Sequence, residues 1–338
     1  MGKTLVLLLN VGTPDKPDKK SVAKYLVQFL SDKYIINLPW FFRKFLVCFI
    51  IVPFRTPKSV NRYKSLWNEH GSPLLYHLNN LSSKLQEKIG DDYLVMGAMR
   101  YGNPSVISVF KRIKNENIEK IIVVPLYPQY ATSTTESAKQ HVLQTIKKSG
   151  KTYDVTFLEQ FYNHQAFIET FANQIETYNP KNFDHIVFSF HGIPVVQVEN
   201  LHPEIKENVC TCAEKMPEHG TRCYKATCYE TSRLLATKLS ISREKYDVAF
   251  QSRLGFNWLQ PYLDKMLLDL LIKGKKKILV ISPSFVADCL ETNVEIKNEF
   301  ANMFVQNGGS KLVVVKSLND DDNWVETLLK IILESKNK

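Results

Sequence analysis

A histidine at the end of a predicted strand is the first residue whose position suits chemistry. His191 closes the β-branched and aromatic run His185–Phe190, and Gly192 and Pro194 follow at once and end strand pairing. In an open parallel α/β sheet, ligands bind at the carboxyl ends of the strands. His191 is therefore a candidate base or metal partner. The alternative is a histidine that only hydrogen-bonds a loop carbonyl.

Three glutamates form the second candidate group. On a helix predicted to begin near Asp288, Glu291, Glu295 and Glu299 fall at i, i+4 and i+8 and share one face. Like charges at this spacing cost roughly a few tenths of a kcal/mol per pair, so local stability does not favour the row. The row predicts a carboxylate track that attracts a divalent cation or carries protons, with a solvated acidic face as the alternative.

Four of the six cysteines are clustered. Cys210, Cys212, Cys223 and Cys228 lie within nineteen residues of each other. This density predicts a metal site with four thiolate ligands, and both zinc and iron–sulfur clusters accept such a set. A transient disulfide pair is the remaining alternative.

Parallel strands and intervening helices are predicted to position these groups. Apolar runs of strand length alternate with helical stretches, which favours right-handed crossover units and two doubly wound sheets over one eight-stranded barrel. The predicted strands are Leu5–Asn10, Leu94–Ala98, Lys120–Pro128, Val155–Phe161, His185–Phe190, Val248–Gln251, Lys277–Ser282 and Lys311–Ser317.

The composition is that of an ordinary globular protein with a basic surface. The 338 residues are 44% hydrophobic and 23% charged, and the net charge is +10. This charge favours an anionic partner, but no basic arm or zinc-finger spacing points to nucleic acid. The apolar run at the start is too short for a signal-peptide core, so we expect a cytoplasmic protein.

The segment Tyr34–Arg55 is unusually apolar and will be called the apolar segment. It is rich in Phe, Ile and Val around a single basic pair, Arg43 and Lys44. Pro39 and Pro53 bracket about thirteen residues, too few to span a bilayer. It predicts either a core helix or the lip of a ligand cleft that also enters a membrane surface.

Four motifs together resemble the ferrochelatase family over nearly the whole chain. This resemblance implies insertion of Fe2+ into protoporphyrin IX to form protohaem, the last step of haem biosynthesis, in a cleft between two Rossmann-like domains. Each domain is expected to be a mostly parallel four-stranded sheet flanked by helices. The expected domains are 1–150, 151–310 with a cysteine insertion at 200–228, and a strand and helix at 311–338 that return to the first domain. The motifs are Ser189–Pro194, Pro125–Thr135, Gln251–Gly255 with Trp258–Pro261, and Phe285–Glu291.

The resemblance also implies roles for single residues. His191 matches the family's essential histidine, proposed to take pyrrole protons or handle the metal, and Glu291 matches the carboxylate facing it. Glu295 and Glu299 match an acidic row on a helix that the family often widens by a π-turn. Cys289 stands where other members carry a histidine. The implied porphyrin contacts are Val11, Tyr63, Ser72, Arg100, Tyr101, Trp258 and Phe285.

A cofactor and a location follow from the same resemblance. Some ferrochelatases carry a 2Fe-2S cluster, so we expect one on the four clustered cysteines in preference to zinc. The apolar segment matches the family's substrate lip and membrane contact, which implies peripheral association with the inner membrane and contacts with other haem-pathway proteins. Two alternatives remain, a chelatase for coproporphyrin III and a haem or porphyrin carrier with a redox-sensing cluster.

Overall fold

The chain forms two compact units, each with its own sheet. The structure is a computed structural model that describes residues 2–253, 255 and 257–335, so Leu254 of the Gln251–Gly255 motif lies outside the described residues. The first unit comprises the chain up to Tyr127, Thr132–Glu159 and the stretch from Asn319 onward. The second unit comprises Pro128–Ala131 and Gln160–Leu318.

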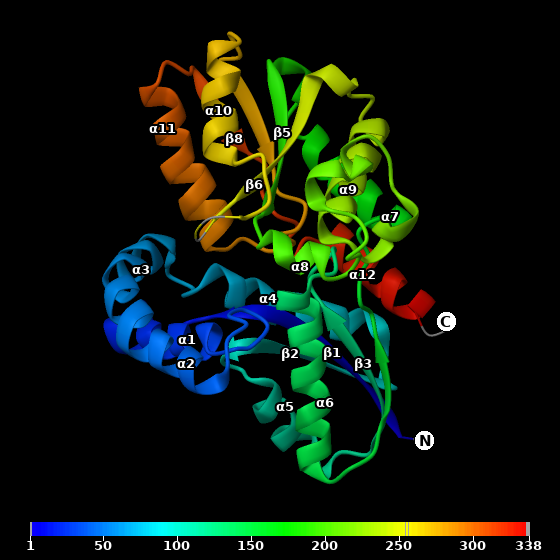
Figure 1. The fold of residues 1–338 in the computed structure, drawn as a ribbon. Coiled ribbons are helices and arrows are strands. Elements are labelled where there is room, and N and C mark those ends of the chain that lie inside the picture. The colour runs from blue at the N-terminus through cyan, green and yellow to red at the C-terminus, as the bar shows by residue number, and fades with distance from the viewer. Residues whose placement is uncertain (1, 254, 256, 336–338) are drawn as a thin grey trace. The chain divides into compact units, whose positions relative to one another are not determined.

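The first unit is built on a parallel sheet with the strand order β2-β1-β3-β4 (Figure 1). Its strands are β1 (Lys3–Thr13), β2 (Tyr93–Gly102), β3 (Ile118–Pro125) and β4 (Asp154–Phe157). Its α-helices are α1 (Lys19–Leu30), α2 (Trp40–Phe45), α3 (Val52–Leu66), α4 (Pro73–Ile89), α5 (Val106–Arg112), α6 (Ser137–Ser149) and α12 (Asp322–Glu334). The π-helices η1 (Leu46–Ile51) and η3 (Thr132–Glu136) and the 3-10 turn η2 (Ile113–Asn115) complete it.

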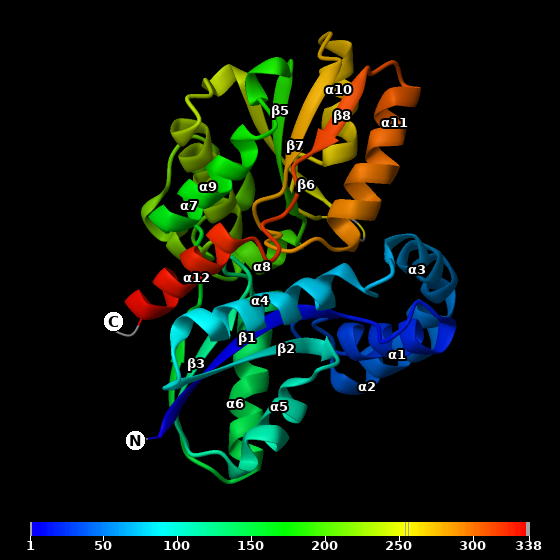
Figure 2. The same ribbon diagram turned by 180° about the vertical axis from the view of Figure 1, so that it is seen from behind.

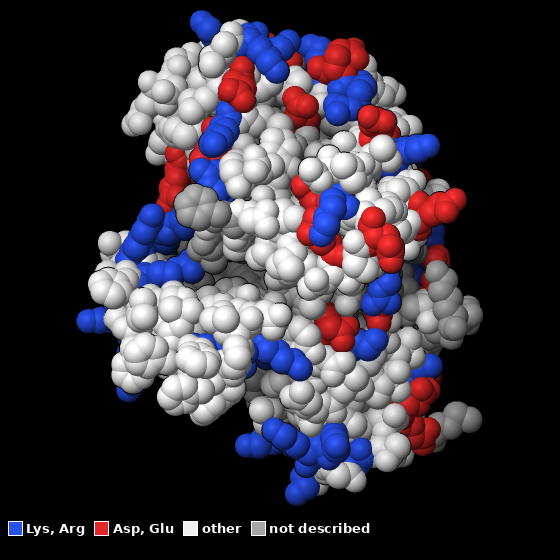
Figure 3. Space-filling view, in the orientation of Figure 1, with Lys and Arg blue, Asp and Glu red and all other residues white. Residues whose placement is uncertain are grey.

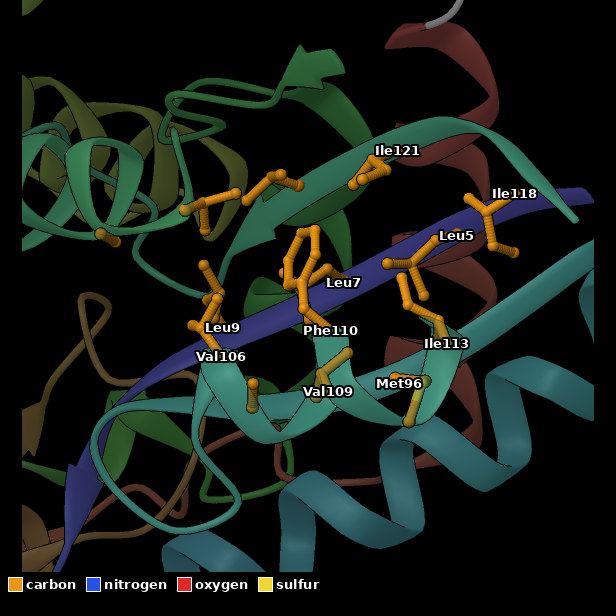
Figure 4. Close-up of a cluster of buried hydrophobic side chains, with 14 of the residues drawn as sticks. Leu5, Leu7, Leu9, Met96, Val106, Val109, Phe110, Ile113, Ile118 and Ile121 are labelled. Atoms are coloured by element: carbon orange, nitrogen blue, oxygen red, sulfur yellow. The ribbon is translucent and has the colours of Figure 1, made fainter. Parts of the chain in front are cut away.

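Side-chain alternation along β1 divides the core of the first unit into two layers. Leu5, Leu7 and Leu9 are fully buried against residues of α5 and α6 (Figure 4). Val6 and Leu8 point to the opposite face, because successive strand residues alternate. On that face α4 packs against β1 and β2, and α12 packs on α4 (Figure 2). Both faces of the sheet are therefore covered, as a parallel sheet requires.

The second unit is built on a parallel sheet with the order β6-β5-β7-β8. Its strands are β5 (His185–His191), β6 (Tyr246–Gln251), β7 (Lys277–Ile281) and β8 (Lys311–Val314). Its α-helices are α7 (Gln165–Glu176), α8 (Val195–Glu199), α9 (Tyr224–Lys238), α10 (Leu263–Ile272) and α11 (Ala301–Gln306), and the π-helix η9 (Glu291–Phe300) leads into α11. Short 3-10 turns are η4 (Pro180–Asn182), η5 (Glu207–Val209), η6 (Thr211–Ala213), η7 (Glu218–Arg222) and η8 (Arg243–Lys245).

The two sheets repeat one topology. In each, the first strand of the unit has the second strand on one side and the third on the other. The carboxyl ends of the first and third strands therefore flank a topological switch point, which is where doubly wound sheets bind ligands. The predicted α/β fold with two parallel four-stranded sheets is confirmed, and the single-barrel alternative is wrong.

The end of the chain differs from the expectation. The strand and helix of 311–338 were both expected on the first domain. Strand β8 instead pairs with β7 of the second sheet, and only the chain from Asn319 belongs to the first unit. The first unit also extends to Glu159 rather than to residue 150, because β4 pairs with β3.

Candidate active site

His191 is the last residue of β5, the first strand of the second unit's switch point. Its Nδ1 lies 2.6 Å from the carbonyl oxygen of Gly192. A carbonyl oxygen only accepts, so Nδ1 carries a hydrogen, and in the neutral imidazole the lone pair is then on Nε2. A side chain at Gly192 would meet Gln251 O at 2.9 Å, which explains the glycine beside the imidazole. The local geometry thus presents the imidazole as a proton acceptor.

Two aromatic rings flank this imidazole. The ring centroids of Trp258 and Phe285 lie 6.5 and 6.4 Å from that of His191. Phe285 belongs to the loop after β7, and Trp258 forms a β-bridge with Pro194. The structure therefore brings together three residues that the sequence placed in three separate motifs.

The glutamate row starts at the first residue of the π-helix η9, which comes after the loop that follows β7, and the family resemblance predicted such a widened helix. Along this helix Glu291 is half-buried, Glu295 is buried and Glu299 is exposed. Ser252 donates a 2.7 Å hydrogen bond to Glu295 Oε2. The solvated-face alternative is therefore wrong for Glu295. The row leads from the neighbourhood of the β7 loop to the surface.

Cys289 precedes the glutamate row in a buried position. Burial raises the pKa of its thiol well above the usual range, and the negative charge of Glu291 acts in the same direction. The Cys289 amide donates to Thr292 Oγ1 over 3.0 Å. Cys289 is therefore a neutral thiol. It occupies the position at which, by the family resemblance, other members carry a histidine.

Arg100 and Tyr101 lie at the carboxyl end of β2 and are held by a carboxylate that the sequence analysis missed. Arg100 Nη2 donates to Asp32 Oδ2, and Tyr101 OH donates to the same oxygen over 2.7 Å. Ser137 Oγ donates to that oxygen as well, over 2.6 Å, and receives a 2.9 Å bond from Arg100 Nε. Asp32 follows the end of α1, where the sequence suggests only a turn residue. Its role depends on contacts that are distant in sequence.

The hydrogen bonds decide the ionisation of Asp32. Burial by itself raises the pKa of this carboxyl, but bonds from Ser137 and the Tyr34 amide and the charge of Arg100 together hold it below its usual value. Burial raises the pKa of Tyr101 well above its usual range, so the phenol stays a donor. Asp32 is thus a charged anchor for the Arg100 guanidinium at neutral pH.

Acid is expected to destabilise this unit through His141 of α6. Burial, and next the charge of Arg100, lowers the pKa of His141 to about 4. An unfolded histidine titrates near 6.5, so the unfolded chain binds more protons between these values, and stability is lost as the pH falls from about 6.5 to about 4. Linkage alone gives a loss of about 3 kcal/mol in the free energy of unfolding over this window, and because the His141 side chain is only partly buried, solvent screening reduces the expected loss to about 2 kcal/mol, measured by urea unfolding at several pH values.

The matched variants are His141→Gln and His70→Gln. The first should flatten the pH dependence of unfolding, whereas the second, at an imidazole with 51% of its side chain exposed, should leave it unchanged. An unaltered slope in His141→Gln would contradict the assignment.

The other expected porphyrin contacts of the first unit lie around the carboxyl end of β1. Ser72 directly precedes α4 as its N-cap residue, and its hydroxyl lies 2.9 Å from that of Thr13. Tyr63 of α3 is buried and meets the ring of Tyr25 edge-on at 6.1 Å. Val11 in β1 is half-buried and packs against the hydrophobic core.

The apolar segment is largely exposed, so the core-helix alternative does not hold. Arg43 turns inward and donates to Ser31 O over 2.9 Å. The surface over α2 carries almost no charged side chains in Figure 3, while Lys and Arg stand over α3. Among the residues described, no helix is long and apolar enough to cross a membrane. The exposed side chains include Trp40 (66%), Phe41, Phe42, Phe45, Phe49 (70%) and Phe54 (81%).

The four clustered cysteines lie near one another with free thiols. Cys212, Cys223 and Cys228 are buried and Cys210 is half-buried. Burial, followed by the neighbouring thiol of Cys210, raises the pKa of Cys212 to about 12, although Lys225 opposes the shift. The pKa of Cys228 is raised by burial and by Cys223 and Cys212, so all four thiols interact.

Two imidazoles adjoin these cysteines. His202 Nε2 lies 3.3 Å from Cys223 Sγ and His219 Nε2 lies 3.5 Å from Cys210 Sγ. In the described part of the chain, no group of three or more His, Cys, Asp or Glu is arranged to hold a metal ion as it stands. The donor types therefore suit a thiolate site, but its ligands are not drawn together.

Solved structures support the fold. The sirohydrochlorin chelatase SirB of Bacillus subtilis subspecies spizizenii, in complex with cobalt, superposes with a TM-score of 0.55 at 8% identity, covering 99% of this chain and 96% of that one. A second structure, SirB from Bacillus subtilis with Fe3+, gives a TM-score of 0.53 at 9% identity, covering 98% and 95%. At such identities the likeness concerns the two-sheet fold alone.

Sequence relatives decide the family. A ferrochelatase from Legionella pneumophila (strain Lens) is 39% identical over 97% of this chain and 98% of its own length. One from Coxiella burnetii (strain Dugway 5J108-111) is 38% identical over 98% and 93%. The family model for ferrochelatase matches residues 3–336. The chain therefore belongs to the ferrochelatase family, the porphyrin chelatases that insert iron in haem synthesis.

Proposed function

We propose that this ferrochelatase acts on protoporphyrin IX, with His191 as the proton acceptor and Glu291 as the metal partner. One observation carries the proposal. His191 closes β5 and the loop after β7 leads to Glu291, and these paired strands flank the switch point of their sheet.

The chemistry requires a base and a metal ligand. A free porphyrin loses two pyrrole N–H protons as Fe2+ enters, so the products are haem and two protons. His191 Nε2 has the free lone pair to take a pyrrole proton, and Glu291 supplies a carboxylate for the incoming cation. Trp258 and Phe285 flank the imidazole and are proposed to press on the macrocycle.

Glu295 and Glu299 are proposed as the metal path. The row runs from an exposed to a buried carboxylate on one helix, so a divalent cation meets a negative charge at each step. The Ser252 hydroxyl keeps Glu295 oriented. The same carboxylates suit the return of the released protons to solvent.

The first unit is proposed to contribute the macrocycle contacts Arg100, Tyr101, Tyr63, Ser72 and Val11. Arg100 is half-buried and its Nη1 is not used in the network with Asp32 and Ser137 described above. A guanidinium held in this way suits a dianionic porphyrin.

An anaerobic turnover assay tests the function. With Fe2+, we expect haem formation from protoporphyrin IX and much slower turnover of coproporphyrin III, whose additional carboxylates demand more cationic partners. Preferred turnover of coproporphyrin III would contradict the proposed substrate. Binding of both porphyrins without any metal insertion would favour a carrier.

We also propose a 2Fe-2S cluster on Cys210, Cys212, Cys223 and Cys228. Four interacting thiols in a buried, low-dielectric site are the donor set that such a cluster uses, and none of them is in a disulfide. The thiols have to move closer to complete the site. When bound, the cluster supplies iron–thiolate bonds that cross-link residues 210–228.

The cluster prediction is tested by anaerobic purification. We expect visible absorption and two iron atoms per chain, both lost in Cys228→Ser. Cys48→Ser, at a half-buried cysteine outside the group, is the matched control and should keep both. Stoichiometric zinc in a colourless protein would show that the thiolates hold zinc instead.

The apolar segment is proposed to contact the cytoplasmic face of the inner membrane. Its exposed aromatic side chains are followed along the chain by the exposed cations Lys58 and Lys64 of α3, a combination that suits an anionic lipid surface. An enzyme placed there is in position to exchange an apolar porphyrin with other haem-pathway proteins.

Vesicle sedimentation tests this contact. Phe49→Ser is expected to weaken binding to vesicles of phosphatidylethanolamine and phosphatidylglycerol about tenfold, because burying one phenyl ring is worth about 1.5–3 kcal/mol. Ile272→Ser, at an apolar side chain on α10 that is even more exposed than Phe49, should bind as the wild type does. Equal binding by both variants would contradict the proposal.

A further inference from the structure

We propose that Tyr224 is a positioning residue that couples the cysteine segment, residues 200–228, to His191. The Tyr224 hydroxyl donates a 2.9 Å hydrogen bond to the main-chain oxygen of His191. The Tyr224 side chain is buried, and a buried phenol is held strongly by the acceptor it meets. A side chain of α9 therefore holds the last peptide of β5.

The other end of this connection is the cysteine group. Tyr224 is the first residue of α9 and directly follows Cys223. Cys228 lies one turn later on the same face, and its side chain hydrogen-bonds that of Tyr224. Thr227 Oγ1 donates to the carbonyl oxygens of Cys223 and Tyr224 over 3.1 and 3.0 Å. The start of α9 thus carries Tyr224 between two of the cysteines, Cys223 just before the helix and Cys228 one turn into it.

A displacement of the start of α9 is transmitted to the His191 imidazole through a single peptide group, the one that joins His191 to Gly192. Tyr224 holds the carbonyl of His191, and the His191 ring is oriented by the next carbonyl, that of Gly192, at 2.6 Å. Displacements of about 1 Å in a catalytic group cost up to about a hundredfold in rate. The inference rests on the roles proposed above for His191 and the cysteines. Its consequence is that movement of the four cysteines toward or away from one another changes the orientation of the His191 ring.

The test compares two tyrosines of α9. Tyr224→Phe removes the hydroxyl that meets both His191 and Cys228 and keeps the ring, and Tyr229→Phe removes the hydroxyl of a second buried tyrosine on the same helix. Both variants are purified anaerobically, and iron content and visible absorption are measured against the wild type. The His191 ring signal is followed by NMR of protein with labelled histidine and assigned by its loss in His191→Gln.

We expect the His191 signal to shift in Tyr224→Phe but not in Tyr229→Phe. The kcat for haem formation should fall about three- to tenfold in Tyr224→Phe alone, the effect of one neutral hydrogen bond, with the porphyrin KM within twofold of wild type. Cys228→Ser should shift the same signal, and the shift should be smaller when Tyr224→Phe is already present.

Two results would overturn the coupling. One is an unchanged His191 signal in Tyr224→Phe, and the other is an equal change in Tyr229→Phe, which would indicate a general effect on α9. The NMR comparison does not depend on turnover. A failure of the proposed catalytic role, with full activity in His191→Ala, is therefore distinguishable from a failure of the coupling.

Discussion

Replacing His191 by alanine is expected to lower kcat for iron insertion about 10²- to 10⁴-fold, the usual contribution of a positioned general base. The physical reason is the free Nε2 lone pair, which exists because Nδ1 donates to Gly192 O. Porphyrin binding should persist, since Trp258 and Phe285 remain. Anaerobic turnover and porphyrin fluorescence titration measure the two quantities separately.

His185→Asn is the matched control on the same strand. His185 lies at the amino end of β5, is buried and pairs with Asp247 over 2.9 Å. Its loss should lower the melting temperature but leave kcat near the wild-type value. If His191→Ala kept more than a tenth of the wild-type kcat, the proton-acceptor role would be wrong.

Replacing Glu291 by glutamine is expected to reduce kcat about a hundredfold and raise the KM for Fe2+. The substitution removes the negative charge at the inner end of the row while keeping the side-chain volume, so a metal partner is lost without a cavity. Rates measured over a range of Fe2+ concentrations, with protoporphyrin IX in excess, separate the two parameters.

Glu299→Gln provides the graded comparison at the outer, exposed end of the row. Solvent screens an exposed carboxylate, so this variant should change the KM for Fe2+ by only a few fold and leave kcat intact. Equal effects of the two substitutions would contradict an ordered path from Glu299 to Glu291.

The sequence by itself determined the elements of this protein. All eight predicted strands exist, because an apolar run bounded by turn residues is a local signal. His191 and the glutamate row were also predictable, since each is defined by its position within one strand or one helix. The exposure of the apolar segment followed from the family resemblance and not from its composition, which suits a core helix equally well.

Only the tertiary structure decided which elements meet. Strand order, the pairing of β8 with β7 and the repeat of one topology depend on contacts between residues far apart in the chain. Asp32 lies 68 residues from Arg100, and Tyr224 lies 33 residues from His191. A turn aspartate and a helix-start tyrosine carry no local pattern, because their roles come from partners that folding brings to them.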